Sequence, residues 1–165
     1  DRVVLGSAQP DFTYGFATQL RYKNWNLSLN FQGSYGNKLY NQMEQALESP
    51  NASYNASTKL LNRWTAENPS TTIPRAVAQN NYSAYLDSRF IEDASYLRLK
   101  NIQIGYNFQP KVGNNQKLGV YLYASAQNLL TITNYSGYDP EYSGYVDRGT
   151  YPASRTFTFG VKLSY

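Results

Sequence analysis

Five segments of the chain alternate apolar residues with small or polar ones at every second position. Successive side chains of a β-strand point to opposite faces of a sheet, so each segment predicts a strand with one apolar and one polar face. The predicted strands cover residues 11–22, 25–35, 96–108, 117–128 and 155–165. Six polar residues at alternate positions make the second strand the clearest: Asn24, Asn26, Ser28, Asn30, Gln32 and Ser34.

The connections between these strands alternate between short and long. Tight turns are expected at Lys23-Asn24 and over residues 109–116, whereas residues 36–90 and 130–154 form long excursions. Bacterial outer-membrane barrels have this arrangement, with short periplasmic turns and long extracellular loops. Within the first excursion, residues 39–47 and 58–64 favour short helices packed over the barrel mouth.

The third predicted strand changes phase in its middle. Leu97 and Leu99 share one parity, whereas Ile102 and Ile104 share the other. A β-bulge near Asn101 places all four on one face, because a bulge inserts one extra residue into a strand. Alternatively, Leu97 and Leu99 point inward at a plug or loop.

Five strands are too few to close a barrel, and an open sheet edge in lipid leaves backbone groups unpaired. The expected fold class is therefore all-β, an antiparallel transmembrane β-barrel fragment whose other strands lie on a longer parent polypeptide or on another chain. A soluble five-strand sandwich is the alternative. It leaves a face of Phe, Leu, Trp and Tyr exposed on every strand.

Composition agrees with a membrane barrel that has a wet interior. The chain has 17 Tyr, 7 Phe and 2 Trp, but neither Cys nor His. Tyrosine suits both barrel girdles and wet cavities. No apolar run is long enough for a spanning helix, and no signal segment opens the sequence. The formal net charge of +4 is scattered, which argues against a nucleic-acid partner.

Several stretches, in this order, resemble the C-terminal part of the SusC-like family of TonB-dependent outer-membrane transporters. They include Gly33-Ser34-Tyr35-Gly36-Asn37, Asn62-Arg63-Trp64-Thr65, Glu67-Asn68-Pro69-Ser70-Thr71, Ile73-Pro74-Arg75, the run from Ser88 to Asn101, Gln127-Asn128-Leu129, Gly137-Tyr138-Asp139-Pro140-Glu141, Tyr151-Pro152 and Arg155-Thr156. The resemblance implies the last five strands of a 22-stranded barrel in the outer membrane of a Gram-negative bacterium. It also implies a plug domain and a TonB-engaging segment, neither of them in this sequence, and a SusD-like surface lipoprotein as a hinged lid.

Three sets of candidate residues follow from these predictions. Aromatic and acidic residues of the long loops are candidates for contact with cargo or lid: Trp64, Tyr82, Tyr85, Tyr138, Asp139, Tyr142 and Tyr145. Inward cations are expected to line the lumen and pair with carboxylates of the plug: Arg21, Arg98 and Lys100. The resemblance further implies a signal for the barrel-assembly machinery at Gly160, Leu163 and Tyr165.

Catalysis and metal binding find little support in the sequence. Glu92 and Asp93 are adjacent in a strand and point to opposite faces, so they are expected to contact the plug or a neighbouring loop. Asp139, Glu141 and Asp147 do not have the spacing of a calcium loop. We expect a non-enzymatic transporter without cofactors or metal.

The expected function is import of glycans or peptides, and the sequence carries no code for the cargo. Three other functions remain open. They are a barrel component of a larger outer-membrane assembly or secretion complex, a siderophore or cobalamin receptor, and a soluble carbohydrate-binding β-domain.

Overall fold

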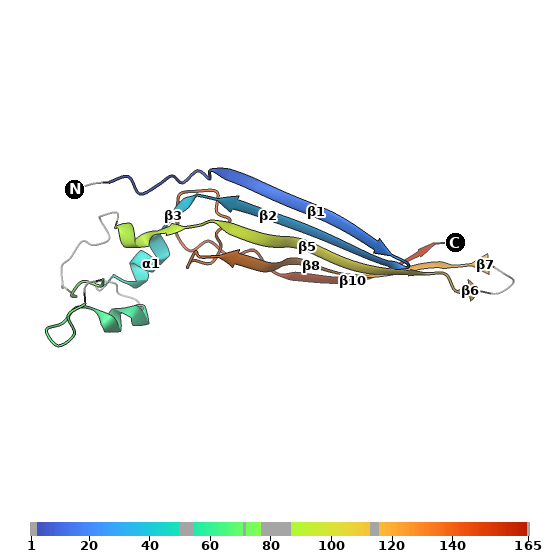
Figure 1. The fold of residues 1–165 in the computed structure, drawn as a ribbon. Helices are drawn as coiled ribbons and strands as arrows, with labels where there is room; N and C mark the ends of the chain where they lie inside the picture. The colour runs from blue at the N-terminus through green and yellow to red at the C-terminus, as the bar shows by residue number, and fades with distance from the viewer. Residues whose placement is uncertain (1–2, 50–54, 71, 77–86, 113–115, 165) are drawn as a thin grey trace.

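The computed structural model describes residues 3–49, 55–70, 72–76, 87–112 and 116–164. Five long strands form one antiparallel sheet in the order β1-β2-β5-β8-β10 (Figure 1). Their bounds are Phe12–Tyr22, Trp25–Tyr35, Tyr96–Phe108, Gly119–Thr133 and Thr156–Ser164. The expected all-β antiparallel sheet is therefore confirmed. No helix among the described residues is long and apolar enough to cross a membrane.

Strand pairing sorts the side chains onto two faces. One face, called the apolar face, takes the large apolar residues of each strand, as the opposed pairs Phe16–Phe31, Leu27–Ile104 and Phe159–Ala124 illustrate. Many of these side chains are exposed: Phe16 is 61% and Phe159 80% accessible. The opposite, polar face takes the intervening Ser, Thr, Asn and Gln residues.

The phase change in the third predicted strand is a β-bulge at Lys100. Phe31 lies opposite Leu99 and Asn30 lies opposite Asn101, so Lys100 is the extra residue. Leu97 and Leu99 consequently share the apolar face with Ile102 and Ile104. The alternative, in which Leu97 and Leu99 point inward, is wrong for this reason.

The fourth long strand continues beyond its expected end at residue 128. Asn128 adopts a positive φ of 51°, and the register shifts on both strands between the pairs Asn101–Gln127 and Leu99–Leu130. Pairing then resumes as far as Thr133. The shift breaks the period of two, which is why the alternation did not reveal these residues.

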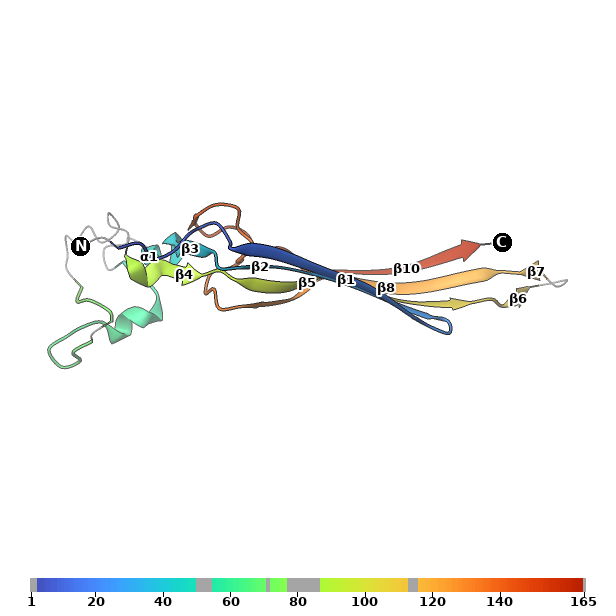
Figure 2. The ribbon, with the colours of Figure 1, turned by 45° about the horizontal axis from the view of Figure 1, so that its top comes forward.

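A small cap covers one end of the sheet (Figures 1 and 2). Strands β3 (Lys38–Asn41), β4 (Ile91–Asp93) and β9 (Val146–Asp147) form a second sheet in the order β4-β3-β9. Leu39, Ala94 and Tyr135 form its buried core, with Tyr142 packed against it. Helix α1 (Gln42–Leu47) and the 3₁₀ helices η1 (Thr58–Asn62) and η3 (Ser88–Phe90) complete it.

The expected helix over residues 39–47 is only partly correct. Residues 39–41 are a strand, because they pair with Ile91 and Glu92 on one side and with Val146 and Asp147 on the other. The helix begins at Gln42, where the Asn41 side chain accepts a hydrogen bond from the Glu44 amide at 3.0 Å. The expected helix at 58–64 is a 3₁₀ helix, η1.

The far end of the sheet carries only short connections. β6 (Lys111–Val112) and β7 (Gln116–Lys117) extend the β5–β8 hairpin beyond the sheet, away from the cap (Figure 2). The long connections therefore lie at one end of the sheet and the short ones at the other, as the sequence predicted.

Gly33 provides a test of the strand packing. The Tyr14 ring lies across Gly33, and its hydroxyl donates a hydrogen bond to the Tyr96 carbonyl at 3.1 Å. A Cβ on Gly33 would lie 2.4 Å from that backbone oxygen, whereas a Cβ on Gly15 would lie 3.6 Å from its nearest neighbour, the Phe31 carbonyl oxygen. We expect Gly33→Ala to lower the free energy of unfolding by about 1–3 kcal/mol, measured by denaturant titration of the reconstituted parent receptor. Gly15→Ala should change it little, and equal effects would contradict this packing.

Candidate functional site: a charged cluster where the last loop meets the sheet

The start of the loop between β8 and β10 is tied to the cap by two carboxylates, Asp147 and Glu92. Asp147, which is 2% exposed, accepts a hydrogen bond from the Tyr135 hydroxyl at 2.8 Å and further ones from the amides of Gly149 and Thr150. Glu92 accepts hydrogen bonds from the amide and hydroxyl of Ser136, both at 2.8 Å. These contacts fix the start of the loop, at Tyr135 and Ser136, to β9 and β4 of the cap.

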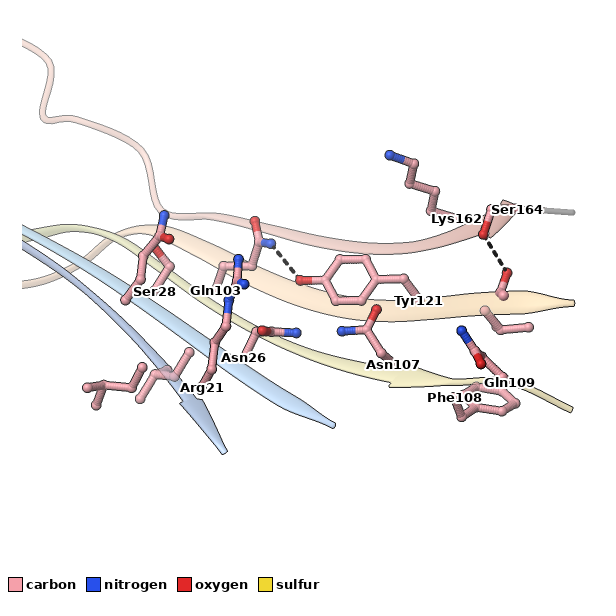
Figure 3. Close-up of a pocket in the computed structure, with 15 residues that line it drawn as sticks. Arg21, Asn26, Ser28, Gln103, Asn107, Phe108, Gln109, Tyr121, Lys162 and Ser164 are labelled. Carbon is pink, nitrogen blue, oxygen red and sulfur yellow. Dashed lines mark hydrogen bonds between the residues drawn. The ribbon is translucent and has the colours of Figure 1, made fainter. Parts of the chain in front are cut away.

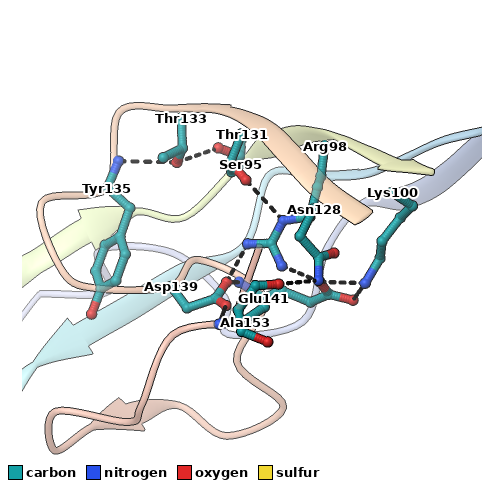
Figure 4. A network of polar contacts seen from close by, with 11 residues as sticks. Ser95, Arg98, Lys100, Asn128, Thr131, Thr133, Tyr135, Asp139, Glu141 and Ala153 are labelled. Carbon is teal, nitrogen blue, oxygen red and sulfur yellow. Dashed lines mark hydrogen bonds and ion pairs between the residues drawn. The ribbon is translucent and has the colours of Figure 1, made fainter. Parts of the chain in front are cut away.

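The same loop is tied to the main sheet by a second cluster (Figure 4). Arg98 of β5 is 3% exposed, and its Nη1 donates to Glu141 at 2.7 Å while Nη2 pairs with Asp139. Its Nε donates to the Thr131 hydroxyl of β8 at 2.9 Å. The planar guanidinium thus bonds two loop carboxylates and one strand residue at once.

A second cation of β5 joins this cluster. Lys100 is two residues after Arg98, so the alternation of side chains places both on the polar face of the sheet. Lys100 Nζ reaches both oxygens of Glu141, at 2.9 and 2.8 Å. Two cations and two carboxylates therefore balance within the cluster.

Hydrogen bonding keeps Asp139 and Asp147 ionised despite their burial. Burial is the largest influence on Asp139 and disfavours its charge, but Arg98 and the amides of Ala153 and Glu141 together hold its pKa below the ordinary value. Asp147 is likewise buried, and its bonds from Thr150, Tyr135 and Gly149 lower its pKa. The pKa of Tyr135 is raised, first by burial and then by its bond to Asp147.

The polar face also forms a hollow near the end opposite the cap (Figure 3). Its volume is about 600 Å³, and polar-face side chains such as Arg21, Gln103 and Lys162 line it. Gln103 donates a hydrogen bond to the Tyr121 hydroxyl at 3.1 Å. The hollow is the inner surface of the curved sheet.

Several known proteins are similar to this chain in sequence and in fold. No family model matches the chain. The TonB-dependent receptor P3 of Formosa agariphila is 37% identical, over all of this chain and 17% of that receptor. The TonB-dependent receptor SusC of Bacteroides thetaiotaomicron is 29% identical, over all of this chain and 16% of SusC. The chain belongs to the SusC-like TonB-dependent receptors.

Solved structures place the SusC-like sheet in a larger protein. The RagAB peptide transporter matches with a TM-score of 0.85 and 33% identity, over 98% of this chain and 18% of that chain. RagAB described in a closed-closed state matches at 0.84, and in an open-open state at 0.80. This SusC-like chain therefore spans less than a fifth of the proteins that it matches, as part of a TonB-dependent barrel.

The predicted aromatic contact residues of the SusC-like loops have different surroundings. Tyr138 and Tyr145 are 58% and 72% exposed, and Trp64 is 40% exposed. Tyr142 instead packs against the cap core. Tyr82 and Tyr85 lie outside the described residues. Exposed aromatic rings for a partner or cargo thus remain at Trp64, Tyr138 and Tyr145.

The predicted charged residues have partners that the sequence did not indicate. Arg98 and Lys100 lie on the polar face as expected, where they pair with the chain's own Asp139 and Glu141; their contact with a plug stays a prediction. Both oxygens of Asp139 are bonded within the chain, so this residue holds the loop instead of presenting a free carboxylate to a ligand. Arg21 lines the hollow.

Residues of the predicted assembly signal lie at the open edge of the sheet. A Cβ on Gly160 would overlap the Tyr123 ring, so the ring covers this glycine on the polar face. Leu163 is 61% exposed on the apolar face. Tyr165 is outside the described part of the chain. The role of these residues as a signal stays a prediction.

Metal and acid–base chemistry gain no support from the site. Within the described ranges, no group of three or more His, Cys, Asp or Glu residues is placed to hold a metal ion. Glu92 binds the neighbouring loop at Ser136, and Asp93 binds Ser95 and Lys38. Sequence reasoning missed Tyr135 and Thr131, whose roles depend on partners from distant segments.

The lowered pKa values predict how the loop responds to acid. A carboxylate whose pKa is lowered on folding stabilises the fold fully above its unfolded value of about 3.9. That stabilisation is lost as pH falls through the lower pKa of the folded state. For Asp139, the groups that set this response are the Arg98 guanidinium and the amides of Ala153 and Glu141. Hydrogen exchange of the loop amides, corrected for intrinsic rates, should show constant protection from pH 8 to 5. A midpoint near neutral pH would contradict this assignment.

Proposed function

We propose that the chain forms part of the barrel wall and the cell-surface mouth of an outer-membrane importer in a Gram-negative bacterium. The observation that carries this proposal is the apolar face. Its side chains are exposed on every long strand, including Leu20, Trp25, Ile104, Leu122 and Phe157. An exposed apolar surface of this extent is characteristic of a protein that contacts lipid or a partner.

The dimensions of the apolar face support lipid as its surroundings. Aromatic pairs lie towards both ends: the Phe12 and Tyr35 rings are 5.4 Å apart, and the Trp25 and Tyr106 rings 4.8 Å. At about 3.3 Å per residue, β1 rises roughly 33 Å between Phe12 and Tyr22. A tilt near 45° leaves roughly 23 Å along the membrane normal, against an apolar band of about 25 Å in such barrels.

The family supports an importer that draws energy through TonB, by way of a plug and a TonB-engaging segment outside this sequence. Glycans or peptides are the proposed cargo, and the likeness to the RagAB peptide importer favours peptides. Similar matches to the states described as closed-closed and open-open favour a wall that keeps its shape while the importer opens.

A SusD-like lipoprotein lid is the proposed partner at the cap. The exposed rings of Trp64, Tyr138 and Tyr145 offer flat apolar surfaces that pack well at protein interfaces and on cargo. The remaining barrel strands would pair with the open edges of β1 and β10, which form the two sides of the sheet. The barrel-assembly machinery would pair with the same kind of edge during insertion.

The test uses the parent receptor in a strain that lacks its own copy. Peptide mixtures and glycans are supplied as separate sole nutrients, and the receptor is purified to identify lipoproteins that accompany it. A variant with Trp64, Tyr138 and Tyr145 all changed to Ala should lower import or lid recovery at unchanged receptor abundance. Tyr151→Ala, at an exposed loop residue outside this set, is the control. No import of either nutrient class and no accompanying lipoprotein would overturn the proposal.

A further inference from the structure

The charged cluster lies on the polar face of the sheet. Arg98 lies opposite Gln32, and Gln103 lies opposite Ser28, so strand pairing places Arg98 on the same face as the residues of the hollow. Asp139 and Glu141 bond the Arg98 guanidinium there. The β8–β10 loop therefore crosses onto the face that a closed barrel turns toward its lumen.

The hydrogen bonds and ion pairs of the cluster attach the loop firmly to the sheet. All three guanidinium nitrogens of Arg98 are engaged, and Asp139 also accepts from the amides of Glu141 and Ala153. Among the described residues, no buried side-chain nitrogen or oxygen lacks a partner. Separating such a buried pair leaves a desolvated charge unpaired, which makes spontaneous release rare.

We propose that residues 139–141 are a strap that holds the β8–β10 loop permanently against the inner wall, with Arg98 as the positioning residue. The loop is then a fixed constriction of the passage rather than a gate that swings outward. This inference rests on the proposed barrel and gives a positioning role to Asp139, a residue that was expected to contact cargo or lid.

The strap also determines the position of a neighbouring aromatic ring. Tyr138 directly precedes Asp139 and, with Arg155 and Thr131, lines a hollow of about 380 Å³ beside the cluster. Fixing Asp139 fixes the backbone of Tyr138, so this exposed ring stands at the inner wall near the cap. A label at Tyr138 consequently reports whether the strap is attached.

The first experiment measures attachment without requiring transport. The full-length receptor, in a cysteine-free background, carries a spin label on Tyr138→Cys and is reconstituted in lipid vesicles. Asp139→Asn, and separately Lys100→Met, should raise label mobility several-fold. Arg155→Gln should not, because Arg155 lines the same hollow but forms no ion pair with a described residue. Equal mobility in all variants would overturn the strap.

Two measures keep this experiment decisive. Heat-dependent gel migration shows whether each variant forms a closed barrel, and Lys100→Met removes only the half-exposed partner if Asp139→Asn fails to assemble. The double variant Lys100→Met/Glu141→Gln should raise mobility by less than the sum of the two single variants, because both changes remove the Lys100–Glu141 ion pair while Glu141→Gln also weakens the bond to Arg98. Additive increases would contradict a shared attachment.

The second experiment distinguishes a fixed strap from a gate. Lys100→Cys and Glu141→Cys remove both ion pairs of Glu141, and a short bifunctional thiol reagent joins the two positions in the full-length receptor. Uptake of the nutrient mixture that supports growth should be the same with and without the cross-link. Loss of uptake on cross-linking would show a moving gate. If the unmodified receptor imports nothing, the proposed function fails while the label result still decides the attachment.

Discussion

Replacing Arg98 with Met is expected to lower the free energy of unfolding of the parent receptor by about 3–5 kcal/mol. The side chain is 3% exposed and holds Asp139 and Glu141 while bonding Thr131. Met fills a similar volume but donates no hydrogen bond, so Asp139 is left ionised in a buried place with only two amides. The loss of stability should be largest in the β8–β10 loop, because the cluster joins this loop to β5 and β8.

A double-mutant cycle separates this cost from general loss of packing. Denaturant unfolding in lipid vesicles is measured for Arg98→Met, Asp139→Leu and the double variant. The double variant should cost much less than the sum of the two single changes, because the second change removes the charge that the first left unpaired. Arg155→Met is the control for loss of a loop arginine. Strictly additive costs would contradict a direct buried pair.

Phe159→Arg is expected to destabilise the assembled barrel by about 2–4 kcal/mol. This is the cost of an Arg side chain that faces lipid near the bilayer midplane. Phe159 is 80% exposed, near the middle of β10, and lies on the apolar face opposite Ala124. Its surroundings in the proposed barrel are lipid chains, which cannot solvate the guanidinium. Folded receptor in the outer membrane should fall strongly.

The adjacent residue supplies the matched control. Thr158 neighbours Phe159 in the same strand but lies on the polar face, opposite Ser125. Thr158→Arg adds the same charge and side chain, facing the wet interior, so assembly should be near that of the unchanged receptor. Quantifying the heat-modifiable barrel in membrane fractions compares the two variants. A reversed order of effects would mean that the faces are misassigned.

The long strands could be predicted because their contacts are regular. Alternation gives both the strand and the face of each residue. The phase change between Leu99 and Ile102 indicated either a bulge or two inward-pointing leucines, and the strand pairing shows the bulge. Strand pairing assigns the faces of the fourth strand, since Val120, Leu122 and Ala124 lie opposite apolar-face residues of β10. A period of two is a local signal that needs no knowledge of distant partners.

The cap and the charged cluster depend on distant partners, and so the sequence did not reveal them. Leu39 and Tyr40 have helix-compatible neighbours, but their pairing with Ile91 and Glu92 makes them a strand. Arg98 and Asp139 were assigned to different contacts because the β5–β8 connection and the whole of β8 separate them along the chain. Their charges alone did not indicate that they meet, and only the fold of the last loop brings them together.

The most direct test of the membrane-wall account is a spin-label scan along β10 of the parent receptor in lipid vesicles. Single Cys labels at successive positions from Phe157 to Leu163 are measured for collisions with oxygen, which concentrates in lipid, and with a water-soluble nickel complex. The account predicts oxygen maxima at Phe157, Phe159, Val161 and Leu163, with nickel maxima at the positions between them. Uniformly high nickel accessibility, or the opposite phase, would contradict a lipid-facing wall.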